Sequence, residues 1–406
     1  MARPCALVIG GSVGGLFAAN LLRTVGWDVT VFERADGDLG DRGAGVGTRP
    51  ELFAVMRRIG LHTDASIGVE VSSRICLDRG GNIVHEVPTR AVTSSWARLW
   101  RPLKQALPDD CYRAGAELKR VEQDAESVTA IFADGTRAQG DLLIGADGIH
   151  STVRQQFLPE LEPAYAGYVA WRGVVTGQDV PAALHATVFH HMIFCFPPEG
   201  LMLSIPLPGP DGGRACNFVW FQLVDYDRTL PLLCTDESGH QHGYSIPPPL
   251  IQPRLISALK STASALFAPQ VAAVVAGTTQ PILQPIFDLE SPRLVFGRVA
   301  LLGDAAFVAR PHVATGVMKA ALDAQGLADA LAGGADLDAA LMRYEHERRQ
   351  FGSWLVARGR RIGASLAAQP QAERRAPLQQ RAEVLLREYG AAGLVDNEPI
   401  TARNFG

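Results

Sequence analysis

The chain has 406 residues, of which 47% are hydrophobic and 20% are charged, and its formal net charge is −4 at pH 7. This balance excludes a basic surface for nucleic acid or an anionic membrane, and no apolar run reaches the roughly 18 residues that a membrane-spanning helix needs. The six cysteines are scattered with no C-x-x-C spacing, so we expect a reduced, cytoplasmic setting and no metal site.

The N-terminal region has the pattern of a βαβ unit: strand 5–9, turn 10–15, helix 16–25 and strand 27–33. The glycine-rich turn lets backbone N–H groups approach a pyrophosphate, and the acid that ends the second strand accepts hydrogen bonds from ribose hydroxyls. One position departs from G-x-G-x-x-G, because a serine stands where the middle glycine is usual. The unit predicts a dinucleotide site at Gly10, Gly11, Ser12, Val13, Gly15, Glu33 and Arg34.

A second glycine-rich turn covers residues 42–48, before an expected helix at 50–59. Arg42 can bind a phosphate bidentately, and Gly43 and Gly45 allow the backbone to approach a flat or anionic ligand closely. The alternative interpretation is a loop with a solvated arginine. We include these three residues among the candidate cofactor contacts.

The middle of the chain is expected to form a hairpin at 69–90, a helix at 94–107 and strands at 117–123, 127–132 and 141–144. The last strand ends in Gly145-Ala-Asp-Gly148, followed by a helix that carries Ser151 and Arg154. Asp147 and Gly148 therefore repeat the arrangement of Glu33, an acid at a strand end beside glycine. The alternative for Asp147 is an Asx-turn that caps the helix.

Residues 165–284 are rich in strand patterns and punctuated by proline. We expect a hairpin of 186–197 with 201–207 and a neighbouring strand at 216–224, whose aromatic side chains form a sheet core and part of a flat apolar pocket. His190 and His191 are adjacent, so they face opposite sides of a strand and at most one can enter a given pocket.

The stretch 299–319 joins a strand end to a helix start. An apolar strand at 299–302 ends at Gly303-Asp304, a loop carries Pro311, His312 and Gly316, and a helix begins near Val317. The carboxylate of Asp304 suits a polyol hydroxyl, and the unpaired N–H groups of the helix start suit developing negative charge. Candidate cofactor contacts are therefore Gly303, Asp304, Gly316, Val317 and Met318.

Two long helices are expected to close the chain, at 336–366 and 371–390, with their arginines on a solvated face. The fold class is α/β: a Rossmann-like nucleotide-binding domain with an inserted β-rich domain and C-terminal helices. We expect the nucleotide domain at 1–68, 95–164 and 285–332, the inserted β-sheet domain at 69–94 and 165–284, and the helical segment at 333–406.

Three segments, GGSVGG…FER, GADGIHSTVR and GDAAFVARPHVATG, occur in this order. Together they resemble the signatures of single-component FAD-dependent aromatic hydroxylases, the para-hydroxybenzoate hydroxylase-like family, and the likeness covers essentially the whole chain. Within the family, segments 165–173, 217–220 and 304–312 most resemble members that hydroxylate dihydroxypyridine. The resemblance implies FAD, with NAD(P)H as electron donor and no separate domain for it.

The chain departs from the family at three places. Where the family has an arginine near 100–103 for FAD, Arg98 and Arg101 are the stand-ins, and Met318 replaces a common asparagine. The strand aligned with the benzoate-binding arginine has Ser-Ile-Pro-Leu at 204–207, which argues against a benzoate in that pose.

The resemblance implies a monooxygenase that uses O2 through a flavin C4a-hydroperoxide to hydroxylate an electron-rich ring, such as a hydroxypyridine. His312, beside Pro311 in the flavin-facing loop, is the expected base because an unperturbed histidine exchanges protons near neutral pH; His190 or His191 is second. The alternatives are a reductase or halogenase of the same fold, or a non-catalytic FAD or nucleotide-binding protein. Expected partners are the small aromatic substrate and O2, without nucleic acid or membrane, and a homodimer stays open.

Overall fold

The structure is a computed structural model that describes residues 3–40, 45–63, 67–197, 200–243, 245–334, 336–367 and 377–388. Arg42 and Gly43 lie outside these described residues. Among the helices in these ranges, none is both long and apolar enough to cross a membrane.

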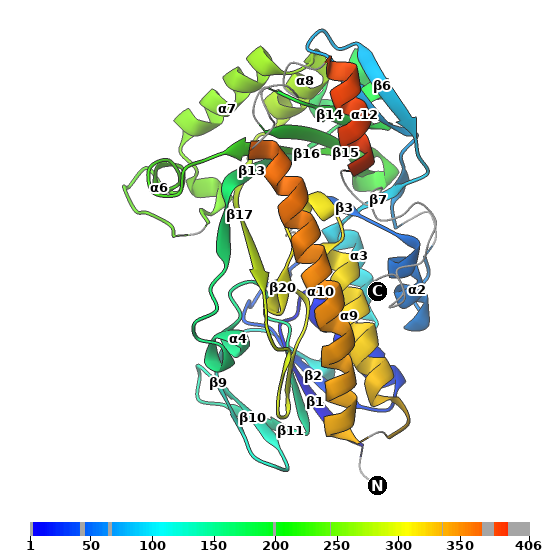
Figure 1. The fold of residues 1–406 in the computed structure, drawn as a ribbon, viewed down its shortest axis with the longest axis vertical. Coiled ribbons are helices and arrows are strands. Elements are labelled where there is room, and N and C mark those ends of the chain that lie inside the picture. The colour runs from blue at the N-terminus through cyan, green and yellow to red at the C-terminus, as the bar shows by residue number, and fades with distance from the viewer. Residues whose placement is uncertain are drawn as a thin grey trace.

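A six-stranded, mostly parallel sheet forms the lower half of the molecule in Figure 1. Three of its four central strands, Cys5–Ile9, Leu142–Gly145 and Val299–Leu301, are uninterrupted apolar runs, as expected of parallel strands that are buried on both faces. The strand order is β18 (Val295–Phe296), β19 (Val299–Leu301), β12 (Leu142–Gly145), β1 (Cys5–Ile9), β2 (Asp28–Phe32) and β8 (Tyr112–Arg113). The carboxyl ends of β1, β2, β12 and β19 therefore meet at one edge, which brings together loops that are up to about 300 residues apart in the chain.

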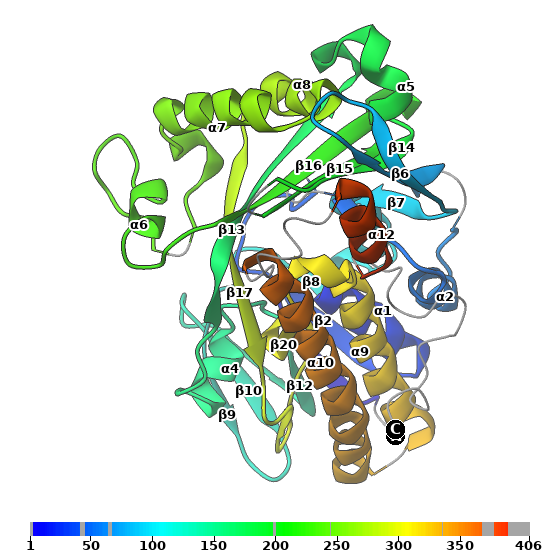
Figure 2. The same ribbon diagram turned by 45° about the horizontal axis from the view of Figure 1, so that its top comes forward.

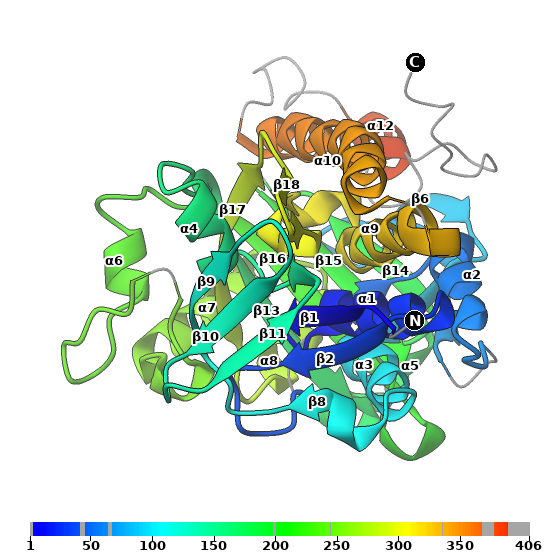
Figure 3. The same ribbon diagram turned by 90° about the horizontal axis from the view of Figure 1, so that it is seen from below.

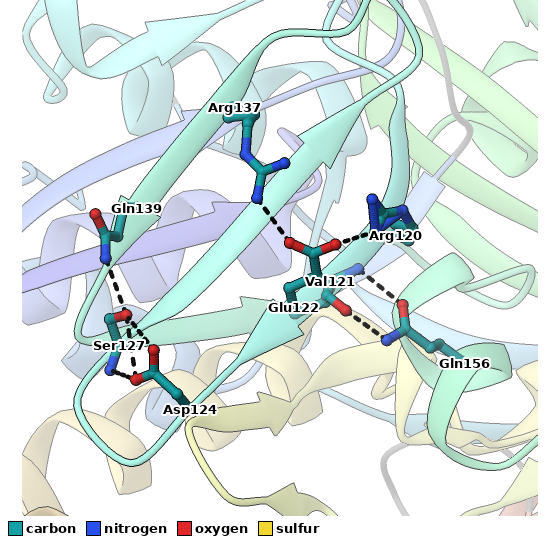
Figure 4. Close-up of polar contacts among 8 residues, drawn as sticks. All are labelled: Arg120, Val121, Glu122, Asp124, Ser127, Arg137, Gln139 and Gln156. Atoms are coloured by element: carbon teal, nitrogen blue, oxygen red, sulfur yellow. Dashed lines mark hydrogen bonds and ion pairs between the residues drawn. The ribbon is translucent and has the colours of Figure 1, made fainter.

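A three-stranded antiparallel meander lies beside this sheet, as the view from below shows (Figure 3). It consists of β9 (Leu118–Gln123), β10 (Val128–Phe132) and β11 (Arg137–Gly140). The side chain of Gln156, in α4 (Thr152–Phe157), bonds both backbone groups of Val121 at 2.8 and 2.7 Å and so fixes α4 to β9 (Figure 4). Glu122 links Arg120 and Arg137 on the exposed side of the meander (Figure 4).

An eight-stranded mixed sheet forms the upper half (Figures 1 and 2). Its order is β20 (Phe307–Val308), β17 (Ile282–Glu290), β13 (Ala164–Thr176), β16 (Arg214–Leu223), β15 (Leu201–Pro208), β14 (His191–Cys195), β5 (Ser73–Leu77) and β6 (Ile83–Pro88). Two helices, α7 (Pro253–Leu266) and α8 (Pro269–Gly277), cover one face of this sheet (Figure 2).

Alternation along the strands divides the side chains of this sheet between two cores. Trp171, Phe218 and Trp220 pack with α7 and α8, whereas Ala170 and Phe221 pack with the parallel-sheet half. The second face is the one that meets the loops at the carboxyl ends of the parallel strands, and it is called the inner face below.

The remaining elements connect and cover these sheets. A small sheet has the order β3 (Gly45–Gly47), β7 (Val92–Ser95) and β4 (Val69–Glu70). The longer helices are α1 (Val13–Thr24), α2 (Pro50–Arg58), α3 (Trp96–Gln105), α9 (Gly316–Leu331), α10 (Leu337–Ala367) and α12 (Leu378–Glu388); the short ones are α5 (His185–Val188) and α6 (Leu230–Leu233). Helices α9 and α10 run side by side along the molecule (Figures 1 and 2).

Three element predictions were wrong in their bounds. Helix α1 begins at Val13 rather than residue 16, because Ser12 takes an extended conformation as the N-cap and the glycines after it fit a helical turn. Residues 185–188 form α5, so β14 covers only His191–Cys195. The hairpin is confined to β5 and β6, since β4 pairs with β7 instead.

Candidate functional site

The first strand-end loop of the site is the glycine turn between β1 and α1. Gly10 has a φ of +110°, and a Cβ there would lie 2.4 Å from the carbonyl oxygen of Ala146. A Cβ on Gly15 would lie 1.9 Å from the carbonyl oxygen of Gly10, and one on Gly11 would lie 2.3 Å from the hydroxyl of Tyr112. The N-cap Ser12 makes no side-chain hydrogen bond to the helix. The first N–H groups of α1, including that of Val13, are therefore left for a ligand.

Glu33 ends β2 beside this turn and is 8% exposed. Its carboxylate accepts hydrogen bonds from the backbone N–H of Gly11 at 2.7 Å and of Ala35 at 3.0 Å. These bonds fix the orientation of the side chain, and each oxygen keeps a lone pair for a hydroxyl. The neighbouring Arg34 is exposed.

A hollow of about 500 Å³ opens on this side of the molecule, lined by Asp36, Asp38, Trp100, Arg101, Lys104 and Tyr112 among others. The indole N–H of Trp100 donates to the carbonyl of Gly11 at 2.9 Å, which joins the hollow to the glycine turn. Of the two arginines considered for this position, Arg101 lines the hollow, whereas Arg98 donates to the carbonyl of Gly209 at 3.1 Å.

Asp147, at the end of β12, uses its carboxylate inside the protein. It accepts hydrogen bonds from Ser151 Oγ at 2.5 Å and from the N–H of Val153 at 3.1 Å, so it supports the start of α4, whose N-cap is Ser151. Burial raises its pKa. Gly148 follows with a φ of +79°, so the backbone of this loop remains the part that can approach a ligand.

Arg154 braces the next loop, a role that the sequence alone did not reveal. It is fully buried and donates from Nη1 to the carbonyl of Ala305 at 3.1 Å and from Nη2 to that of Ile149 at 2.6 Å. Gly303, with a φ of +63°, donates its N–H to Asp323 at 3.1 Å. These contacts fix the backbone on both sides of Asp304.

Asp304 itself points outward, with 55% of its side chain exposed. Its Oδ1 lies 3.4 Å from Nζ of Lys319, which is buried and also donates to the carbonyl of Phe307 at 2.6 Å. A carboxylate exposed in this way beside a buried lysine can accept a hydrogen bond from a ligand hydroxyl.

The loop before α9 contains the one non-glycine residue with positive φ in the described part of the chain, Ala314 at +51°. Thr315 is the N-cap of α9 but makes no cap bond, and its hydroxyl is buried without a hydrogen-bond partner among the described residues. The N–H groups of Gly316, Val317 and Met318 form the open helix start, while the Met318 side chain is buried in the core. Gly47 of β3 packs against Ala314, since a Cβ on it would lie 3.2 Å from the carbonyl oxygen.

His312 lies on the inner face and is 4% exposed. Its Nε2 is 2.7 Å from the hydroxyl of Tyr168, and its ring centroid is 4.4 Å from that of Phe221. Burial, followed by the charges of Arg310 and Arg172, lowers the pKa of His312 to about 3. The expectation of proton exchange near neutral pH was therefore wrong, and His312 is a neutral imidazole there. Pro311 precedes it in a short helical turn.

The other two histidines are not brought to His312. Nδ1 of His191 lies 2.8 Å from the hydroxyl of Ser73, and by alternation it shares a strand face with Ile193, which packs under α7 and α8. His190 is exposed in the turn before β14, where its carbonyl accepts from the N–H of Ser72. Both histidines therefore lie off the inner face.

Three polar residues of the inner face were missed as site residues: Tyr168, Arg172 and Asn217. Alternation in the strand Tyr168-Val-Ala-Trp-Arg172 puts the first and last of these on one face, and this was the available signal. Which face points toward the strand-end loops depends on the packing of the whole sheet.

Comparison with known proteins gives matches over almost the whole chain. The model of a family described as FAD binding domain matches residues 5–222, and one described as FAD binding domain-like matches residues 165–288. The chain is 33% identical over 362 residues to the 2,6-dihydroxypyridine 3-monooxygenase of Paenarthrobacter nicotinovorans, covering 88% of this chain and 90% of the relative. The chain belongs to the FAD-dependent aromatic monooxygenases. As a member of this family it uses FAD, with NAD(P)H as electron donor.

Two solved structures of family members share the fold. The 2,6-dihydroxypyridine-3-hydroxylase of Arthrobacter nicotinovorans superposes with a TM-score of 0.85 at 31% identity, over 92% of this chain and 96% of that one. HpxO of Klebsiella pneumoniae, solved with FAD and uric acid, gives a TM-score of 0.77 at 26% identity, over 95% of this chain and 96% of that one. The predicted fold class, family and cofactor are thereby confirmed.

The residues present fit FAD. Two helix starts, at α1 and α9, have no side-chain cap, and the glycine turn leaves no room for side chains. The buried hydroxyl of Thr315 lacks a partner within the described chain, as expected of a group that a bound ligand satisfies.

Proposed function

We propose that this monooxygenase hydroxylates a small hydroxylated nitrogen heteroarene of the hydroxypyridine class. The observation that carries the proposal is the match, over most of both chains, to an enzyme named for 2,6-dihydroxypyridine. Uric acid, present in the structure of the second relative, is also a small nitrogen heterocycle bearing ring oxygens. Ser204–Leu207 offer no arginine for a benzoate, which further favours a heterocycle.

The strand-end loops are proposed to hold the cofactor. Gly10–Gly15 and the start of α1 would bind the pyrophosphate, with Gly148 near it. Glu33 would accept from ribose hydroxyls, and Asp304 from the ribityl chain. The N–H groups of Gly316, Val317 and Met318, with the hydroxyl of Thr315, would donate to the oxygen-bearing edge of the flavin ring.

The inner face is proposed to hold the aromatic ring. The chemistry that bound FAD would supply is acceptance of two electrons from NAD(P)H and transfer of one oxygen atom of O2 to the aromatic ring, with the other oxygen atom released as water. Phe221, Val219 and Leu203 give this face an apolar wall that excludes water from the reacting groups. The ring hydroxyl would lie against the His312–Tyr168 pair, which holds it by hydrogen bonding.

Because the pKa of His312 is about 3, and burial raises that of Tyr168 to about 12, neither group changes charge near neutral pH. In each group burial is the largest cause. The pair therefore positions the hydroxyl of the substrate by hydrogen bonding and does not take up its proton. The negative charge of an ionised substrate needs a different source of stabilisation.

The proposal is tested by adding a panel of hydroxypyridines, uric acid and simple phenols to the FAD-loaded protein. We expect NADH or NADPH oxidation to accelerate with hydroxypyridines, and a product heavier by one oxygen atom. Pyridine without a hydroxyl is the matched control and should give no product. Turnover with phenols alone would contradict the heteroarene assignment, and nucleotide oxidation without any oxygenated product would favour a reductase.

Three coarser features are proposed with this function. The proposed division is a nucleotide domain at 1–68, 95–164 and 285–332, a substrate domain at 69–94 and 165–284, and a helical segment at 333–406. It is supported by the parallel sheet of β1, β2, β12 and β19 in the first unit and by β13 to β16 in the second, although β17 and β20 extend the second sheet beyond residue 284. A cytoplasmic location is supported by six free cysteines. A homodimer is proposed as the assembly to test by light scattering.

A further inference from the structure

One cation on the inner face, Arg172, has no hydrogen-bond or ion-pair partner among the described residues. Arg172 lies on β13 opposite Val219 of β16, one same-face position beyond Ala170 and two beyond Tyr168. No hydrogen bond or ion pair joins Arg172 to any residue that the structure describes. The other cations around the site are all engaged: Arg310 with Asp288 at 2.7 Å, and Lys319 with Asp304.

Arg172 is mostly covered by protein but keeps some access to solvent. Burial lowers its pKa to about 10, yet its side chain keeps partial exposure, so protein surrounds it on most sides while one side stays accessible. Its same-face neighbours Ala170, Val219 and Leu203 are apolar. An unpaired guanidinium within an apolar wall destabilises the folded chain unless a ligand supplies the counter-charge.

Asn217 is a second unsatisfied group on the same face. It is fully buried, and neither Oδ1 nor Nδ2 has a hydrogen-bond partner among the described residues. It pairs with Val174, the next same-face residue after Arg172, so it occupies the diagonal position from Arg172 across the two strands. Diagonal neighbours in a sheet are within reach of a long side chain, so one ligand oxygen can contact both groups.

We propose that Arg172, assisted by Asn217, binds a negatively charged oxygen of the aromatic substrate and so makes the site selective for substrates that ionise. This role rests on the proposed function. The charge of Arg172 is the smallest of the three causes that lower the pKa of His312, so it acts on the group that would hold the ring hydroxyl. The cation thus supplies the stabilisation of substrate charge that the His312–Tyr168 pair does not.

The single positive charge that Arg172 adds to this apolar wall favours the aromatic ring over the nicotinamide nucleotide as the occupant. A single guanidinium among aliphatic side chains matches a flat ligand with one anionic oxygen. A nucleotide carries several phosphate charges, which call for several cations.

The test measures binding of 2,6-dihydroxypyridine and of pyridine to the FAD-loaded protein, from the change in flavin absorbance. Arg172→Gln should weaken binding of the ionisable ligand about tenfold to a hundredfold and leave pyridine unaffected. Arg172→Lys should restore part of the loss because it keeps the charge. Arg254→Gln, an exposed arginine on α7 at the opposite face, is the matched control and should bind as the wild type does.

Asn217→Asp tests the same role without changing Arg172, because the new carboxylate would supply Arg172 with an internal counter-charge. We expect it to weaken binding of the ionisable ligand as Arg172→Gln does, with FAD content unchanged. Equal loss for both ligands in Arg172→Gln would assign the arginine a packing role, and a raised KM for NAD(P)H with unchanged ligand binding would assign it to the nucleotide. Either result overturns the proposal.

Binding by the wild-type protein distinguishes a wrong substrate class from a wrong role of Arg172. If it binds no hydroxypyridine, that class is wrong, and the same variants are tested with uric acid, or with whichever ring the panel identifies, in its anionic and neutral pH ranges. Equal binding of the anion by Arg172→Gln and the wild type then overturns the role of Arg172.

Discussion

The strand-end loops and the inner face differ in whether the protein supplies hydrogen-bond partners for their charged and polar side chains. In the loops, the carboxylates of Glu33 and Asp147 already accept hydrogen bonds from nearby backbone N–H groups, and Arg154 bonds two carbonyls. On the inner face, Arg172 and Asn217 have no partner within the described chain. The difference teaches that the protein itself orients these charged side chains of the loops, whereas Arg172 and Asn217 are completed by what binds there.

A side chain introduced into the glycine turn between β1 and α1 should have the largest effect, because it disturbs the loops in which the protein itself orients the charged side chains. Gly15→Val should abolish FAD binding and lower the yield of folded protein, because even a Cβ there would lie 1.9 Å from the carbonyl oxygen of Gly10. FAD content, from the absorbance of the purified protein, is the measurement. Gly243→Ala is the control, since a Cβ there meets nothing within 4 Å. Normal FAD content in Gly15→Val would remove the turn from the cofactor site.

Removing the imidazole of His312, which is proposed to hold the substrate, should have the next largest effect. His312→Ala should reduce product formation about tenfold to a hundredfold while FAD content stays the same, because it removes a hydrogen bond to the ring and leaves the buried Tyr168 hydroxyl without its partner. His312→Gln should recover substrate binding more than the rate, because it restores a hydrogen-bonding group but not the imidazole. Product yield per NAD(P)H separates the two variants. A normal rate in His312→Ala would exclude His312 from the site.

The loop carboxylates should affect cofactor affinity rather than chemistry. Glu33→Gln and Asp304→Asn each remove a charge-assisted hydrogen bond worth roughly 1.5–3 kcal/mol, so FAD should dissociate about tenfold to a hundredfold more readily. Titration of the apoprotein with FAD measures this. Asp338→Asn, an exposed acid near the start of α10, is the control. Unchanged FAD affinity in both site variants would contradict the placement of the cofactor.

A smaller effect concerns stability against pH. Burial depresses the pKa of His312 from 6.5 to about 3, so the unfolded chain binds an extra proton between these values. The stabilisation is fully present above pH 6.5 and is lost as the pH falls toward 3. Between pH 7.5 and 5, the wild type should lose about 2 kcal/mol more unfolding free energy than His312→Gln. Urea unfolding at both pH values measures the difference, and parallel losses would show that His312 titrates normally.

The two regions also differ in how well the sequence predicts them. Glycine spacing and the acid Glu33 indicated the nucleotide loop because these roles depend on backbone geometry within a few residues. The sequence did not predict Tyr168, Arg172 and Asn217 as site residues, because their common face is formed by strands that are paired across long stretches of chain. The choice among histidines was undecided for the same reason, since only the sheet's packing separates His312 from His191. The pKa of His312 was mispredicted because burial is a property of the assembled core.

The central claim, oxygen transfer from O2 to a hydroxylated heteroarene, is tested most directly with ¹⁸O2. The FAD-loaded protein is reduced with NAD(P)H in the presence of 2,6-dihydroxypyridine, exposed to the labelled gas, and its product is weighed by mass spectrometry. The account predicts one ¹⁸O atom in the product for each NAD(P)H consumed under coupled conditions. Label recovered only in peroxide or water, with the heteroarene unchanged, would contradict it.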